Sequence, residues 1–359
     1  MKKRIADWLF LIILIAIPAA LPAQKTERYI SPNNDGVQDA LVIPIKITDK
    51  RLITSWQLVI EDAEGKVVRT IGNKVALPAK VTFKSFFKQL ATPKTGVDVP
   101  DSVSWNGAMD NGETAPDGTY YYYFTASDDN GNEGVTEKYP VVVDTKAPEV
   151  ALSQPSDKVF GEGAKAGLRI QQSGSVEDNW IGSFKNTAGE VVRTMTWTDA
   201  APAAFSWNGT DDGGRAVPDG VYSYEISATD RAGNVSAPAS ITNIIYSAEK
   251  PAVNVLISGS RYFSPGTDSP ISTVRLLVKI PAPSPAGGNR LTAWSVSIVG
   301  KDGKVYRTYN QDQSENPPDE IVFDGMDGSG SRLPQGVYQA VVSASYLNGY
   351  ETPPVKSPE

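Results

Sequence analysis

One short segment near the N-terminus carries oxygen-bearing side chains at a spacing that suits a hard cation. Asn33, Asp35 and Asp39 surround Gly36 within the sequence SPNNDGVQD. Calcium is bound by carboxylate and amide oxygens on tight turns, although the bidentate Glu that ends an EF-hand loop is missing here. Asn and Asp side chains also accept hydrogen bonds from their own backbone in turns. The segment is therefore predicted to be either a calcium site or a self-capped turn.

Aspartates recur in polar, glycine-rich loops later in the chain: Asp110, Asp211, Asp212 and Asp327. Paired carboxylates are the machinery of many glycosidases, but repeated turns with glycine on both sides favour loop chemistry. The chain has no Cys and no His, which excludes disulfides, thiolate or imidazole metal sites, and Ser-His-Asp or Cys-His catalysis. We therefore expect no enzymatic activity and no cofactor other than calcium.

Three further groups could contact a partner. Tyr121 and Tyr123 alternate along a predicted strand and could form a carbohydrate platform or a domain interface. The basic and aromatic segment 80–88 could touch an anionic envelope surface, or form a solvated hairpin. An arginine also recurs beside a threonine, where it could bind acidic glycans or lie on an exposed strand face with its stem over an aromatic ring. These arginines are Arg69, Arg193 and Arg307.

The loops that carry these residues belong to a stretch that occurs three times. The clearest copy, WNGTDDGGRAVPDGVYSYEISATDRAGN, runs from Trp207 to Asn234, and the others begin at Trp105 and Phe323. An aromatic residue, an Asn-Gly or Asp-Gly pair, a Pro-x-Gly turn, a Tyr and a closing Gly recur in one register, which identifies an internal repeat. The glycine pairs and the Pro-x-Gly predict turns, and the alternation after them predicts a strand with one buried face.

An earlier hairpin is repeated as well. A tryptophan stands nine residues before the glycine that opens GKVVRT, GEVVRT or GKVYRT. Each unit therefore has two aromatic positions that we expect to fill a core. These six core residues are Trp56, Trp105, Trp180, Trp207, Trp294 and Phe323.

The N-terminus resembles an export signal. A basic start at residues 2–4 is followed by a short apolar run from Trp8 to Ile17 and by small residues that suit cleavage after Ala23. An uncleaved anchor is the alternative, but the run is short for a membrane span and no other segment could span as a helix. We expect an exported protein, located in the periplasm or at the cell surface and outer membrane. The net charge of −7 argues against a nucleic-acid partner.

The chain divides into a signal peptide (1–23) and three units at 24–148, 149–248 and 249–359, joined by short Pro-containing linkers. The register of the repeat places the last strand of the third unit from Ser357, and the sequence ends at Glu359. We expect either that the sequence is a fragment of a longer protein or that the third unit lacks its last strand, which would leave an unpaired edge.

Many short strands, hairpin turns at regular spacing and paired aromatic core positions predict an all-β fold of three tandem immunoglobulin-like antiparallel sandwiches. The WNGTDDGGRAVPDGVYSYEISATDRAGN stretch resembles the Ig-like domain of the flagellar hook-capping protein (FlgD type), which occurs as tandem modules in bacterial surface proteins. SPNNDGVQD resembles the opening of gliding-motility-associated C-terminal modules. The third unit departs from the pattern at Phe323 and Gln335. The resemblance implies a fold and leaves function open.

We expect a non-enzymatic exported protein of the cell envelope that acts as a spacer, scaffold or protein-interaction module. One alternative is a module that binds glycan or peptidoglycan through tyrosines and loop carboxylates. Another is the N-terminal accessory region of a larger envelope protein, for example one with an OmpA-like domain. The expected partner is an envelope protein or a cell-wall glycan, and the oligomeric state is not predicted.

Overall fold

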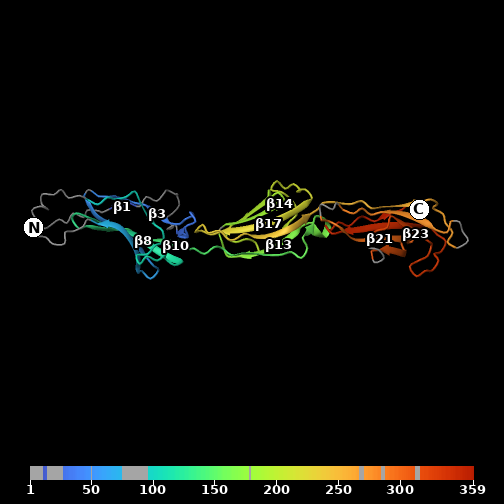
Figure 1. Ribbon diagram of the computed structural model, residues 1–359, viewed down its shortest axis with the longest axis horizontal. Coiled ribbons are helices and arrows are strands. Elements are labelled where there is room, and N and C mark those ends of the chain that lie inside the picture. Colours follow the sequence, from blue (N-terminus) through green and yellow to red (C-terminus); the bar gives the residue numbers. More distant parts are fainter. Residues whose placement is uncertain are drawn as a thin grey trace, which may run out of the picture. The chain divides into compact units, whose positions relative to one another are not determined.

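The computed structural model describes residues 11–13, 27–49, 51–74, 96–177, 179–266, 271–283, 288–311 and 316–359. Within these ranges the chain forms β-strands and one short 3-10 helix, and contains no α-helix (Figure 1). Buried hydrophobic residues gather into three clusters, each enclosed by strands of one sequence region. The predicted all-β, immunoglobulin-like sandwich fold is confirmed. The basic segment 80–88 lies outside the described residues.

The chain forms two compact units. The first comprises the chain up to Pro148 together with the turn Thr229–Ser236. The second comprises Glu149–Ala228 and Ala237–Glu359. We call the three sets of strands modules 1, 2 and 3, for residues 24–148, 149–248 and 249–359. These limits remain those predicted from the repeat.

In module 1 one sheet has the order β2-β10-β8-β5-β6, with β9 beside β8, while β3 pairs with β7. The long strand β8 alternates, so that Tyr120, Tyr122 and Phe124 face the core. The strands are β2 (Arg28–Ile30), β3 (Leu41–Pro44), β4 (Lys46–Thr48), β5 (Ile53–Glu61), β6 (Val67–Lys74), β7 (Ser102–Trp105), β8 (Gly118–Asp128), β9 (Glu133–Val135) and β10 (Tyr139–Val143).

A further strand, β1 (Leu11–Ile13), pairs antiparallel with β4. It lies within the predicted signal peptide, so cleavage after Ala23 would remove it and leave β4 without this partner. The signal peptide itself stays a prediction. Among the described residues, no helix has the length and apolar character that crossing a bilayer requires.

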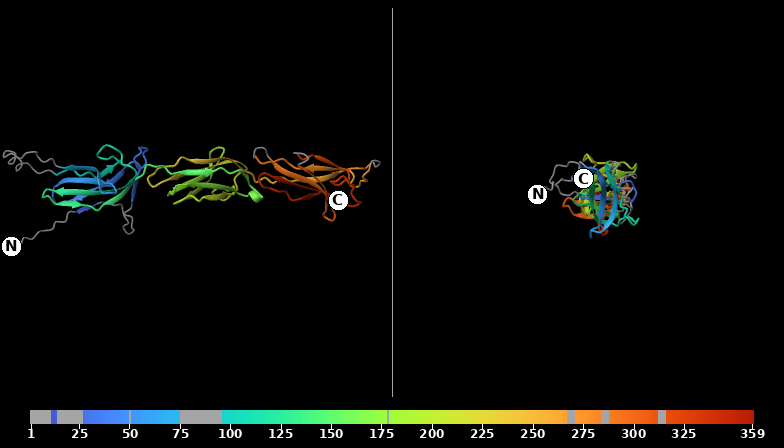
Figure 2. Two further views of the ribbon diagram at one scale, coloured as in Figure 1. Left: turned by 90° about the horizontal axis from the view of Figure 1, so that it is seen from below. Right: turned by 90° about the vertical axis from the view of Figure 1, so that its left-hand side faces the viewer.

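In module 2 a three-stranded sheet, β11-β13-β16, faces a five-stranded sheet, β12-β18-β17-β14-β15 (Figure 2). The helix η1 (Gly163–Lys165) follows β12. The strands are β11 (Val150–Ser153), β12 (Val159–Phe160), β13 (Leu168–Gly174), β14 (Asn179–Asn186), β15 (Val191–Trp197), β16 (Ala204–Trp207), β17 (Gly220–Thr229) and β18 (Ala239–Tyr246).

In module 3 the corresponding sheets are β19-β20-β23 and β22-β21-β24-β25. The last strand, β25, is short. It begins before Ser357, the residue at which the repeat register placed its start. The strands are β19 (Asn254–Ser258), β20 (Val274–Lys279), β21 (Leu291–Gly300), β22 (Val305–Asn310), β23 (Glu320–Phe323), β24 (Tyr338–Tyr346) and β25 (Val355–Lys356).

The six aromatic residues expected in the cores are between 1% and 6% exposed and belong to the three hydrophobic clusters. Full burial of such side chains contributes roughly 2–3 kcal/mol each. The indole N–H of Trp105 donates to the Ala108 carbonyl at 2.9 Å, and Trp207 donates to Thr210 in the same way. Phe323 has no such donor, so module 3 lacks this link between the core and the following turn.

The Pro-x-Gly turns are tied to their strands by tyrosine. The hydroxyl of Tyr120 donates to the Pro116 carbonyl at 2.9 Å, and Tyr222 and Tyr338 bond to the prolines of their own turns at 2.6 Å and 2.7 Å. The Pro carbonyl is thereby satisfied beside the core, where an unpaired acceptor would be costly. This explains why Tyr follows the turn in every copy.

Candidate functional site

The SPNNDGVQD segment forms a loop between β2 and β3 whose side chains bond to its own backbone. Asp39 accepts hydrogen bonds from the N–H groups of Asn34 (2.7 Å) and Gly36 (2.8 Å). Asp35 accepts from Val37 N–H at 2.7 Å, and Asn33 accepts from Asp35 N–H at 3.0 Å. Its three side chains thus act in the way a self-capped turn requires. Calcium binding by Asn33, Asp35 and Asp39 stays a prediction.

The same loop also holds a turn that is distant in sequence but belongs to the same compact unit. Ser31 donates from its hydroxyl to Asn234 Oδ1 at 2.6 Å, and the Arg231 guanidinium lies 5.7 Å from the centre of the Tyr29 ring. Val37 packs against Gly233 so closely that a Cβ there would lie 2.6 Å from a Val37 methyl. The loop is therefore a receptacle for the 229–236 turn, a role that its sequence motif did not predict.

The side chain of Asn234 connects this receptacle to the end of module 1. Its Nδ2 donates to the Asp144 carbonyl at 2.9 Å and to the Asp230 carboxylate at 2.8 Å. Asn234 is 4% exposed. The residue that ends the hairpin turn therefore fixes the backbone that immediately follows β10.

The second compact unit contains a related arrangement around Asn348, which is fully buried. Its Nδ2 donates to the carbonyls of Ser247 and Glu249, both at 3.0 Å, and these residues follow β18. The backbone N–H of Glu162 donates to the Asn348 carbonyl at 3.0 Å, and Lys165 donates to Leu347 at 3.0 Å. Asn348 stands before the closing glycine of its turn, whereas Asn234 stands after it, so the two reach the linkers from different positions.

From the sequence, only the closing glycine that these turns share was identified. The signal that could have found their role is the presence of an amide side chain beside the closing glycine in a turn that must lie near a linker. In the equivalent turn of module 1, Asn132 bonds to Asp128 within the turn itself. Burial favours the neutral acid of Asp128, but donation from the side chain and backbone of Asn132 outweighs this and lowers the pKa of Asp128.

The repeated loop carboxylates serve turns and interstrand ion pairs. Asp211 accepts from the Arg215 N–H at 2.9 Å, and this bond is the main cause that lowers the pKa of Asp211. The Ser329 hydroxyl lowers the pKa of Asp327 in the same type of loop. Among the described residues, no cluster could hold a metal ion through three or more Asp or Glu.

The recurring arginines are paired with these loops, which neither sequence interpretation predicted. Each links a hairpin strand to the loop that follows the core aromatic, although such half-exposed pairs contribute only about 0–1 kcal/mol. The Arg307 guanidinium also lies 4.8 Å from the centre of the Tyr309 ring. The three ion pairs are Arg69–Asp110 at 3.2 Å, Arg193–Asp212 at 3.8 Å and Arg307–Asp324 at 2.8 Å.

The tyrosine strand of module 1 borders a hollow of about 590 Å³ that is lined by Glu61, Tyr121 and Lys138, among others. Tyr123 donates its hydroxyl to Glu61 at 2.9 Å, and Lys138 forms a close ion pair with the same carboxylate. The bond from Lys138 is the main cause that lowers the pKa of Glu61. Tyr121 and Tyr123 do not form one free platform, because Tyr123 is engaged by Glu61 and by the Lys138 ammonium 5.3 Å from its ring centre.

Residues 156–232 match the family model of the FlgD Ig-like domain. The match covers most of module 2 and confirms the resemblance drawn from the repeated stretch. The resemblance of SPNNDGVQD to gliding-motility modules stays a prediction. Among curated proteins, no sequence matches the chain.

Solved structures with the same type of fold are similar at low identity. The fibronectin(III)-like modules of CbhA from Clostridium thermocellum have a TM-score of 0.35 and 15% identity, covering 66% of this chain and 95% of that one. A 1.5-MDa bacterial ice-binding adhesin has a TM-score of 0.34 and 14% identity, covering 89% and 88%. The FN1–FN3 domains of chicken CNTN1 have a TM-score of 0.28 and 15% identity, covering 88% and 91%. These likenesses concern the fold alone.

Proposed function

We propose that this is a non-enzymatic, exported protein of the cell envelope whose tandem Ig-like modules serve as a spacer or scaffold. The observation that supports the proposal is that buried side chains form hydrogen bonds with the backbones of the linkers. The backbone after β18 is held by two hydrogen bonds from the buried Asn348 side chain, and the backbone after β10 is held by Asn234. Linkers with fixed backbones suit a protein that maintains a distance, because a free linker would let its modules reorient.

The spacer hypothesis can be tested within the second compact unit by pulsed electron spin resonance. The chain has no native Cys, so spin labels can be attached at the exposed Val191→Cys and Val305→Cys. We expect a narrow distance distribution that broadens when Asn348→Ala removes the bonds to the linker. Asn130→Ala is the matched control, because Asn130 holds the same repeat position in module 1. A distribution that is already broad in the parent chain would contradict the proposal.

Export is a separate part of the proposal and has its own test. The basic start, the apolar run and the small residues before Gln24 support it. Mass spectrometry of the protein recovered from a bacterial periplasm or surface fraction is expected to show a chain that begins at Gln24. Recovery of the uncleaved chain in the cytoplasm would contradict export, whereas an uncleaved chain in the membrane fraction would favour the anchor alternative.

A glycan-binding function is the second candidate, and it is favoured by the hollow beside Tyr121. A half-buried aromatic ring that borders a hollow with carboxylates suits a sugar, which stacks on the ring and donates hydroxyl hydrogens to acids. Retention on cell-wall material that is lost with Tyr121→Ala, but kept with Tyr139→Phe, would support it. A role as accessory region of a larger envelope protein, for example one with an OmpA-like domain, is compatible with either function.

A further inference from the structure

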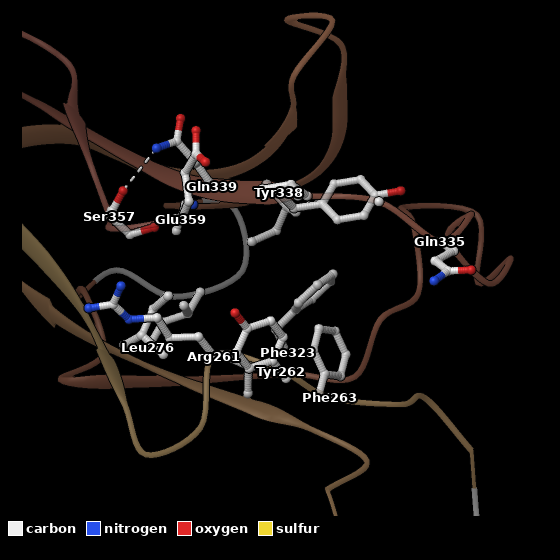
Figure 3. A pocket seen from close by; sticks show the side chains of 16 residues that line it. Arg261, Tyr262, Phe263, Leu276, Phe323, Gln335, Tyr338, Gln339, Ser357 and Glu359 are labelled. Carbon is white, nitrogen blue, oxygen red and sulfur yellow. Dashed lines mark hydrogen bonds between the residues drawn. The ribbon is translucent and has the colours of Figure 1, made fainter.

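The sheet β19-β20-β23 of module 3 carries apolar side chains on both of its faces. On the inner face, Leu276 and Phe323 line a cavity between the two sheets of the module (Figure 3). Because side chains alternate along a strand, their neighbours Leu277 and Val322 point to the outer face. Leu256 of β19 lies opposite Leu277 on that face. These outer residues are 48% (Leu256), 42% (Leu277) and 51% (Val322) exposed, so apolar surface is in contact with water here.

The three outer apolar side chains form one oblique line across the sheet, which we call the apolar row. Leu256 and Leu277 are direct neighbours on adjacent strands. Val322 lies opposite Arg275, two residues along β20 from Leu277, and is therefore the diagonal neighbour of Leu277. Glu320 lies opposite Leu277. Arg275 and Glu320 thus begin on the two sides of the row, and their side chains meet across it at 3.2 Å.

Module 2 shows that the sandwich does not require this row. The register of its paired strands places three polar residues at the three equivalent positions. These residues are Ser153, Gln171 and Ser206, and all of them are exposed. The outer face of an antiparallel sheet is commonly polar, because it faces water. A contiguous apolar patch on such a face indicates instead a surface that contacts a partner.

We propose that the apolar row of module 3 is the contact surface of a symmetric pair formed by two copies of this chain. A two-fold contact uses the same patch on both copies, so the patch has to be complementary to itself. A two-fold axis that runs along the row meets this requirement. Each apolar side chain then meets its own counterpart, and Arg275 of one copy lies over Glu320 of the other.

The charges beside the row are what favour a second copy over an unrelated partner. Arg275 and Glu320 are 63% and 36% exposed, so both can reach a neighbouring molecule. In the symmetric pair the two ion pairs join into one cluster in which positive and negative charges alternate. Electrostatic complementarity of this kind fixes the orientation of two partners more than it raises their affinity. The proposal goes beyond the spacer function, because it concerns association between copies and not distances within one chain.

The size of the face indicates a weak pair. Three strands that lie about 4.8 Å apart, with about five residues of each at ~3.4 Å per residue, form a contact of roughly 15 by 17 Å. Two such faces bury less than the ~1,200 Å² at which stable complexes begin. We therefore expect a reversible dimer with a Kd of about 10 μM to 1 mM.

Sedimentation equilibrium of the full chain, at concentrations up to about 1 mM, measures this association. Leu277→Asp places a charge at the centre of the apolar row and should raise the Kd by about tenfold or more. Gln171→Asp is the matched control, because Gln171 holds the equivalent exposed place in module 2, and it should leave the Kd unchanged. Both substituted side chains point outward, so equal melting temperatures are expected and show that the fold is retained.

Charge reversal provides a sharper test, because it can restore association as well as remove it. Arg275→Glu puts acids on both sides of the row, and Glu320→Arg puts bases on both sides, so each variant alone should stay monomeric. A mixture of the two variants should form a heterodimer, in which every charge faces its opposite. The double variant should dimerise like the parent chain.

Three outcomes would overturn the proposal. A parent chain that stays monomeric at every concentration would leave the apolar row to a partner other than a second copy. A dimer that is equally strong in Leu277→Asp would form through another surface. A mixture of Arg275→Glu and Glu320→Arg that does not associate would show that these two residues do not face each other across a two-fold axis.

Discussion

Replacement of Asn348 by Ala tests how strongly a linker is held. The buried side chain donates to the carbonyls of Ser247 and Glu249 and accepts from Tyr350 N–H at 3.1 Å. Each such bond contributes about 1 kcal/mol net, and a carbonyl left unpaired in a buried place costs a further ~1–3 kcal/mol. Ser247 is 1% exposed, so its carbonyl has little access to replacement water. We expect Asn348→Ala to lower the free energy of unfolding of the second unit by about 3 kcal/mol.

The assay is urea unfolding followed by tryptophan fluorescence, with Asn130→Ala as the matched variant. Asn130 occupies the same turn position, but its side-chain oxygen accepts a hydrogen bond from the exposed Arg51, at 3.0 Å. Its replacement should therefore cost no more than about 1 kcal/mol. If the two variants are destabilised equally, the linker bonds contribute no more than an ordinary surface turn, and the reasoning is refuted.

Three further predictions concern the turns and the buried carboxylate. Asp39→Ala removes the acceptor of two backbone N–H groups and should lower the free energy of unfolding by about 1–2 kcal/mol, measured by thermal unfolding with EDTA present. If the parent chain melts at a higher temperature in millimolar calcium, the loop binds the cation instead. Glu61→Gln should remove part of the acid sensitivity of module 1. The pKa of Glu61 is lowered from 4.5 in the folded state, so the unfolded chain binds more protons, and the stability that Glu61 contributes is lost as the pH falls below 4.5 toward the folded pKa. The measurement is the urea midpoint of both proteins at about pH 6, where a carboxylate is ionised, and at about pH 3, where it is largely protonated. Midpoints that fall equally in the two proteins would contradict this reasoning. Gly349→Ala should lower the melting temperature much more than Gly131→Ala. Both glycines have positive φ, but a Cβ at Gly349 would collide with the Glu162 carbonyl, whereas a Cβ at Gly131 would enter open space. Equal melting temperatures of the two variants would contradict the close approach at Gly349.

The fold was largely predictable because its determinants are local. Asn-Gly and Pro-x-Gly turns, period-two strands and two aromatic positions per unit act through short-range backbone and packing preferences, and the repeat gave each of them three times. The end of module 3 was predictable only to a point. The register located the closing strand near Ser357, but β25 begins at Val355, as far after Gly349 as β18 begins after Gly233.

The sites were less predictable because they depend on contacts between distant residues. Nothing in the local sequence of Asn348 shows that it meets Ser247, and SPNNDGVQD is compatible with a self-capped turn and with a calcium loop. Arg69 and its counterparts were expected either to bind acidic glycans or to lie on an exposed strand face with their stems over an aromatic ring. They lie on strands, Arg307 lies over the Tyr309 ring, and each also pairs with a loop carboxylate. Such pairings are set by how two sheets pack, which a linear pattern does not specify.

The way in which Asn234 and Asn348 hold the linkers bears on how such a chain could arise and change. Both amides donate to main-chain carbonyls, of Asp144 in one case and of Ser247 and Glu249 in the other. Every residue supplies that carbonyl, so the contact makes no demand on the linker's side chains. Duplicated or exchanged modules could therefore be joined without coordinated mutations in the linkers, and the linker sequences would be free to drift while the attachment persists.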